Sequence, residues 1–138
     1  MFFKKKENEN INNDFIDISA LLIHAAKIDE KYTKKEEEII KETLLLIGVK
    51  KEDLGEILKK GEKIEQDSNQ ILNFTKKVKN MKEEDKIKIV EALWKIIYSN
   101  NDADLYETNL MRRLAGLLYV DNKIMADIKD KIKKENPQ

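Results

Sequence analysis

Residues 93–118 read LWKIIYSNNDADLYETNLMRRLAGLL, and this stretch decides the fold. On both sides of a polar loop, apolar residues recur at steps of three and four, which is the periodicity of amphipathic α-helices. Asp104 and Glu107 have the spacing of a capping box, which opens a helix by satisfying its first backbone N–H groups. The stretch therefore predicts two amphipathic helices joined by a short acidic loop.

The first half of the chain repeats this pattern at an offset of 71 residues, which places Thr33 on Asp104 and Glu36 on Glu107. The apolar stripes before and after the loop align at the same offset. Neither pair of helices can bury its apolar faces alone, so we expect the two halves to pack together. The sequence thus predicts an all-α fold, a compact bundle of about seven helices formed by two pseudo-symmetric helix–loop–helix repeats.

Capping and turn residues predict where these helices begin and end. We expect the first helix to begin at Asn13 or Asp14, and the second to end at Gly48. Gly61 and the polar run after it are expected to interrupt a short third helix. Asp121 is the expected cap of the last helix.

The chain has 138 residues, the usual size of one domain. We expect a single helical domain over residues 13–133, preceded by a flexible N-terminal segment (1–12) and followed by a flexible tail (134–138). The absence of Cys excludes disulfides and thiolate chemistry. The sequence shows no signal peptide and no apolar stretch of transmembrane length, so a cytoplasmic protein is expected.

The side chains offer no recognised catalytic machinery. The sequence has no Gly-rich phosphate loop, no nucleophile–His–acid set and no His-Glu-x-x-His motif, so we expect no enzyme. A hydrolase that uses loop carboxylates is a distant alternative. His24 is the only histidine and has no Cys to join it, which leaves zinc without its usual ligands. We expect His24 at the flank of its helix and Trp94 in the core.

The stretch from Trp94 to Arg113 also resembles the TerB-like family, which is named for tellurite resistance. The shared features are an acidic turn, a capping acid, a Tyr-Glu pair and a helix with two adjacent arginines. Residues 26–37 resemble the other Asp-Gly turn of that family. The resemblance covers most of residues 15–132, and it implies an all-helical domain, acidic loops that hold metal ions and a role in stress response.

This chain departs from the family pattern in both turns. Glu30 and Asn101 stand where the family has glycine, and Asn101 tolerates a left-handed backbone better than Glu30 does. Asn100 stands where the family has an aspartate in the second turn, which removes one formal charge. The second loop is therefore less acidic than the resemblance alone implies.

The candidate metal ligands are the oxygen donors of the two loops. The second loop supplies Asp102, Asp104 and Glu107, and the first supplies Asp29 and Glu36 among lysines that oppose a cation. Hard cations bind such oxygens, so we expect a weakly bound Ca²⁺ or Mg²⁺ centred on the second loop. No other cofactor is expected. The competing interpretation is that these acids only cap helices.

The function expected from these features is that of a non-catalytic TerB-like module that is responsive to divalent metals and related to stress. The alternative is a protein-interaction adaptor near the membrane with no metal site. Other proteins are the expected partners in both cases. Nucleic acid is not, because 27 acidic and 27 basic residues leave no net charge. Residues 1–6, MFFKKK, would touch an anionic membrane only weakly.

Overall fold

The computed structural model describes the backbone of residues 2–28, 32–67, 72–99 and 105–135, and the side chains within these ranges except those of residues 2–12, 72 and 105–108. This part of the chain contains helices and no strand, which confirms the all-α prediction. The elements are α1 (Phe2–Ala26), α2 (Lys34–Leu46), a 3₁₀ turn η1 (Lys51–Asp53), α3 (Leu54–Asp67), α4 (Leu72–Lys79), α5 (Glu83–Tyr98), α6 (Leu105–Leu117) and α7 (Asn122–Glu135).

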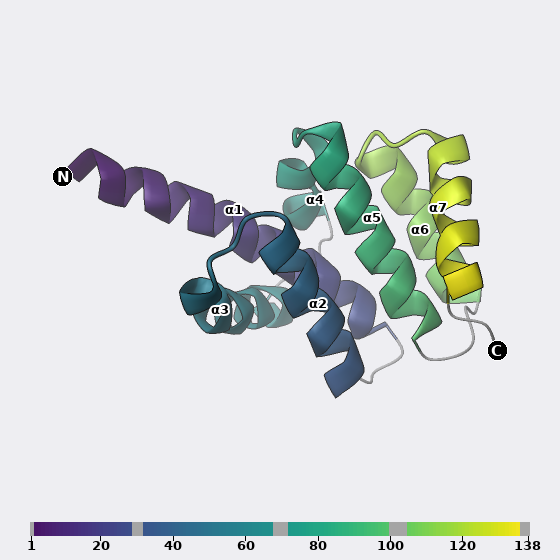
Figure 1. The fold of residues 1–138 in the computed structure, drawn as a ribbon, viewed down its shortest axis with the longest axis horizontal. Helices are drawn as coiled ribbons and strands as arrows, with labels where there is room; N and C mark the ends of the chain where they lie inside the picture. Colours follow the sequence, from purple (N-terminus) through teal and green to yellow (C-terminus); the bar gives the residue numbers. More distant parts are fainter. Residues whose placement is uncertain (1, 29–31, 68–71, 100–104, 136–138) are drawn as a thin grey trace.

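Helix α1 is the central element of the bundle. It contacts α2, α3, α4 and α5, while its N-terminal half extends away from the other helices (Figure 1). Ala20, Leu21, Leu22 and Ile23 are all buried. Four successive residues point around the whole circumference of a helix, so this part of α1 is enclosed on every side.

The start of α1 differs from the sequence-based prediction. The helix begins at Phe2 rather than at Asn13 or Asp14. No Gly or Pro lies between Phe2 and Asn13, so nothing there breaks the helix, and an asparagine or aspartate that can cap a helix also tolerates a position inside one.

A second group of helices, α5, α6 and α7, stands beside this centre (Figure 1). Helix α5 packs against α1, α2 and α7. Trp94 of α5 is 4% exposed and Leu114 of α6 is fully buried, which confirms the predicted core position of Trp94 and places both apolar stripes inside. None of the described helices is both long enough and apolar enough to cross a membrane.

The predicted caps are present where the structure describes them. Thr33 and Glu36 form the expected capping box at the start of α2. Gly48 ends that helix with φ of 116°, a left-handed conformation that favours glycine. The Asp121 carboxylate accepts a hydrogen bond from the Lys123 N–H at 2.7 Å, at the start of α7.

The prediction that Gly61 interrupts a helix was wrong. Helix α3 continues from Leu54 to Asp67, and Gly61 is buried within it. A methyl group added to Gly61 would lie 2.6 Å from Ser19 Oγ and 3.2 Å from the backbone nitrogen of Ala20. Gly61 is therefore the point at which α3 approaches the backbone of α1 too closely for any side chain.

The pseudo-symmetry of the two halves stays a prediction. The structure shows that α3 packs against α1 and that α7 packs against α5, so the first helix of each half has its own later partner. Superposition of residues 15–47 on residues 86–118 would measure how closely the two helix pairs agree.

Gly61→Ala should destabilise the protein by about 1–2 kcal/mol, which is the overpacking cost less the gain in helix propensity. Gly55→Ala is the matched control in the same helix, because its added methyl group meets nothing within 4 Å. The control should be neutral or stabilising by up to about 1 kcal/mol. Urea denaturation of both variants measures the difference, and equal stabilities would contradict the close approach of α3 to α1.

Candidate functional site

The predicted metal ligands lie mostly beyond what the structure describes. Asp29, Asp102 and Asp104 are outside the described residues. Glu107 belongs to the first turn of α6, but its side chain is also outside the described part. Glu36 is the one predicted ligand whose surroundings are known, so the site is built outward from it.

Glu36 is a buried capping residue. Its carboxylate Oε1 accepts a hydrogen bond from the Thr33 N–H at 2.8 Å, and its own N–H donates to Thr33 Oγ1 at 3.1 Å. The side chain is 1% exposed. An oxygen that accepts a backbone N–H has fewer lone pairs left for a cation, so the first role of Glu36 is to fix the start of α2.

The residues that flank the two predicted loops meet at one pocket. Lys35 follows the first capping threonine by two positions, and Ser99 directly precedes the second loop. Both line a cavity of about 180 Å³, which is completed by Ile39, Lys95, Ile132 and Glu135. The start of α2 and the end of α5 therefore lie together, as Figure 1 also shows at the lower edge of the molecule.

Tyr32, which sequence reasoning did not single out, anchors the end of the first loop against α3. It lines a cavity of about 260 Å³ with Glu37, Glu62 and other residues of α2 and α3. Burial raises the pKa of the Tyr32 hydroxyl above its usual range, and the charges of Glu37, Glu62 and Glu36 raise it further. The Tyr32 hydroxyl therefore keeps its proton beside the charges of Glu37, Glu62 and Glu36.

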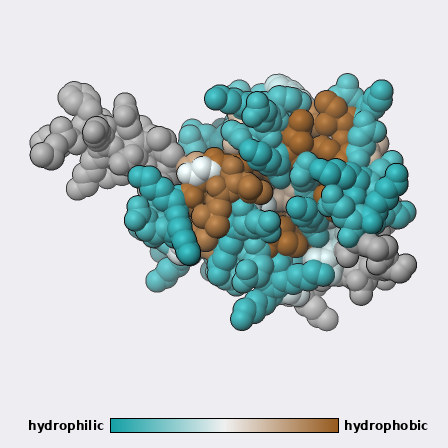
Figure 2. All heavy atoms as spheres, viewed as in Figure 1, coloured by the Kyte–Doolittle hydropathy of each residue, from teal (hydrophilic) through white to brown (hydrophobic). Residues whose placement is uncertain are grey.

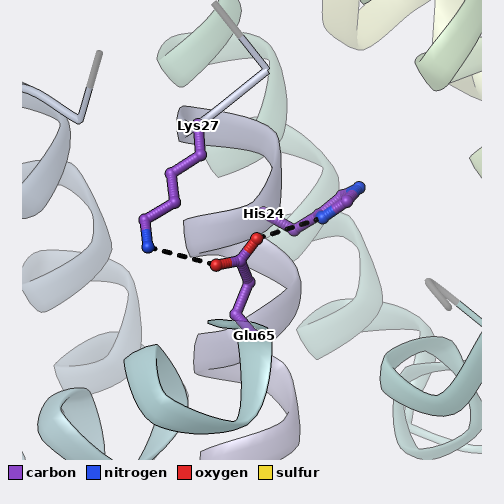
Figure 3. A network of polar contacts seen from close by, with 3 residues as sticks. All are labelled: His24, Lys27 and Glu65. Carbon is purple, nitrogen blue, oxygen red and sulfur yellow. Dashed lines mark hydrogen bonds and ion pairs between the residues drawn. The ribbon is translucent and has the colours of Figure 1, made fainter. Parts of the chain in front are cut away.

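His24, Lys27 and Glu65 form a small polar network between α1 and α3 (Figure 3). Lys27 Nζ lies 3.1 Å from Glu65 Oε2, and His24 Nδ1 lies 3.4 Å from Glu65 Oε1. The His24 side chain is 27% exposed, which confirms its predicted position at the flank of the helix. The network joins the end of α1 to the last turns of α3. Its single carboxylate is that of Glu65.

The described residues contain no group of three or more His, Asp, Glu or Cys side chains that is placed to hold a metal ion. The described residues place the start of α2 and the end of α5 at one pocket, and the capping box fixes the start of α2.

A sequence model of the family described as tellurite resistance protein TerB matches residues 15–130 of the chain. Searches among curated proteins and among solved structures gave no match. The matched region begins at Phe15, at the point where α1 enters the bundle, and ends within α7.

Glu65→Gln should lower the free energy of unfolding by about 0.5–1 kcal/mol, because it removes the charge that faces both His24 and Lys27 in a partly buried setting. The matched control is Glu56→Gln in the same helix, whose partner Lys60 is 57% exposed. This exposed pair is screened by water, so no measurable change is expected there. Thermal unfolding compares the two variants, and equal losses would show that the network adds nothing to an ordinary surface pair.

Proposed function

The chain belongs to the TerB family, whose model matches residues 15–130, and we propose that it is a non-catalytic, stress-related module that responds to divalent metal ions. The metal is bound by acids of the segments that join α1 to α2 and α5 to α6, together with acids in the first turns of α2 and α6. Asp102, Asp104 and Glu107 provide the main ligands, and Asp29 and Glu36 provide the secondary ones.

The observation that carries this proposal is the shared pocket at the flanks of the two loops. Lys35 follows the first acidic segment and Ser99 precedes the second, and both line the same cavity. The point where the first segment ends is therefore close to the point where the second begins. Asp102 is three residues from Ser99, and three residues of extended chain reach about 10 Å. Ligands from both segments can therefore meet around one cation, which needs six to eight oxygens when it is Ca²⁺.

The electrostatics favour the second loop as the centre of the site. From Ser99 to Met111 the sequence contains three acids and no lysine or arginine, whereas Lys31, Lys34 and Lys35 accompany the first loop. A nearby ammonium group raises the free energy of a bound cation. The Glu36 carboxylate is also engaged in its capping box, which reduces its share in binding.

Calorimetric titration with Ca²⁺, Mg²⁺, Mn²⁺ and Zn²⁺ tests this function directly. We expect Ca²⁺ or Mg²⁺ to bind with a dissociation constant of about 10⁻⁴ to 10⁻³ M, the range of loosely organised sites. Asp102→Asn/Glu107→Gln should abolish binding, and Asp29→Asn/Glu36→Gln should weaken it. Gln at position 36 keeps an oxygen that accepts the Thr33 N–H, so the cap survives.

The matched control is Glu83→Gln/Glu84→Gln, which removes the same charge at the opposite end of α5 from Ser99. Its affinity should equal that of the parent. If the parent protein binds none of the four ions, or if the control loses as much affinity as the loop variants, the metal function is wrong.

A second candidate function, an interaction adaptor near the membrane without a metal site, is favoured by one surface feature. Leu45 is 42% exposed and Leu46 is 57% exposed at the end of α2. Figure 2 shows apolar atoms gathered on this face of the molecule, over the end of α2. Exposed apolar patches of this kind mark interaction surfaces.

Co-sedimentation with phosphatidylserine vesicles tests the adaptor function. The parent should bind weakly and lose binding in high salt, because short lysine clusters act through a screened attraction. Lys4→Gln/Lys5→Gln/Lys6→Gln should abolish binding, whereas Lys59→Gln/Lys60→Gln/Lys63→Gln on α3 should not. No sedimentation of the parent in low salt would exclude membrane contact.

A further inference from the structure

A small cavity lies between α5, α6 and α7. Its volume is about 130 Å³. Its buried lining residues are Trp94, Met111, Ala115 and Met125. Two further lining residues, Arg112 and Lys129, carry positive charge. The cavity therefore combines an apolar interior with two cationic groups, which is a different chemistry from that of the acidic loops.

Trp94, which lines this cavity, carries a buried hydrogen-bond donor. Trp94 is 4% exposed, and its buried Nε1 has no hydrogen-bond partner among the described residues. A buried N–H group that has lost its water and gained no acceptor is unfavourable, and few remain so in native proteins. An acceptor atom supplied by a bound ligand would remove this deficit.

The two cationic side chains have no carboxylate partner among the described residues. Lys129 Nζ lies 5.4 Å from the centroid of the Trp94 ring, in a cation–π contact. Arg112 is exposed on α6, and neither it nor Lys129 takes part in an ion pair with a described acid. By contrast, Lys131 of α7 lies 3.4 Å from a carboxylate oxygen of Glu91. Within the described part of the chain, the two positive charges beside the Trp94 indole therefore have no ion-pair partner.

The walls set the size and polarity of what can enter. The walls include the apolar side chains of Met111, Ala115 and Met125. These residues are 1%, 4% and 6% exposed. The cavity is open toward solvent, so at about 130 Å³ it accommodates the apolar part of a small molecule without enclosing it. Methionine side chains have three rotatable bonds, which lets the wall adjust so that a ligand reaches the indole N–H.

We propose that this cavity is a binding site for a small organic carboxylate. The apolar part of the ligand packs against Met111 and Met125. One carboxylate oxygen accepts the hydrogen bond that Trp94 Nε1 offers, and Arg112 and Lys129 neutralise the negative charge. An inorganic anion would leave the apolar walls uncovered, and a neutral molecule would leave both cations unpaired.

The chain contains one Trp, so fluorescence excited at wavelengths that tyrosine does not absorb reports on the surroundings of Trp94. Titration with 3-methylbutanoate at constant ionic strength should give a saturable change, with a dissociation constant on the order of 10⁻³ M or tighter. The neutral analogue 3-methylbutanamide has the same shape and should give at most a tenth of that affinity. Methyl NMR shifts of the methionines provide a second readout that does not depend on the indole.

Arg112→Gln/Lys129→Gln should weaken binding of 3-methylbutanoate at least tenfold, and circular dichroism checks that it remains folded. Lys123→Gln/Lys133→Gln removes the same charge from exposed positions of α7 and should bind as the parent does. Trp94→Phe, followed by NMR, should weaken binding by removing the donor. The proposal is overturned if neither readout saturates, if the amide binds as tightly as the carboxylate, or if the two double variants behave alike.

Discussion

The enclosure of the C-terminal half of α1 is the constraint on which the rest of the structure depends. Leu21, Leu22 and Ile23 are almost fully removed from water, and each such side chain stabilises the fold by about 1.5–3 kcal/mol. A helix buried on every side needs partners on every side, and α2, α3, α4 and α5 provide them. The close approach of α3 is possible only because position 61 has no side chain.

The same enclosure explains why the helix ends that flank the two predicted loops lie together. Once α1 is held in the centre, the capping box fixes where α2 turns back, and α2 then packs on α5. The start of α2 and the end of α5 are consequently brought to one pocket. The Trp94 cavity also depends on α5 and α7, but α6 completes it in place of α2.

Much of the fold could be predicted from the sequence, because helix periodicity and capping are local properties. The Thr33–Glu36 capping box, the Gly48 end of α2 and the Asp121 cap are encoded within a few residues, and all three were predicted. The prediction for Gly61 was wrong because the sequence does not distinguish a glycine that ends a helix from one that lets a neighbouring helix approach closely. Only the position of Ser19 in space distinguishes them.

The site was less predictable for the same reason. Trp94 was correctly placed in the core, but its unpaired N–H and its neighbour Lys129, 35 residues later, are brought together by tertiary packing alone. Tyr32 was overlooked because its acidic surroundings include Glu62 of α3. The metal ligands Asp29, Asp102, Asp104 and Glu107 remain predictions from sequence and family.

Native-state hydrogen exchange tests the central role of α1 most directly. If α1 is the enclosed centre of one cooperative bundle, the amides from Ala20 to Ile23 open only when the whole protein unfolds. Their opening free energy should then equal the free energy of unfolding measured with urea, while the amides of α7 open at lower cost. Amides of α1 that exchange more readily than those of α7 would contradict this account.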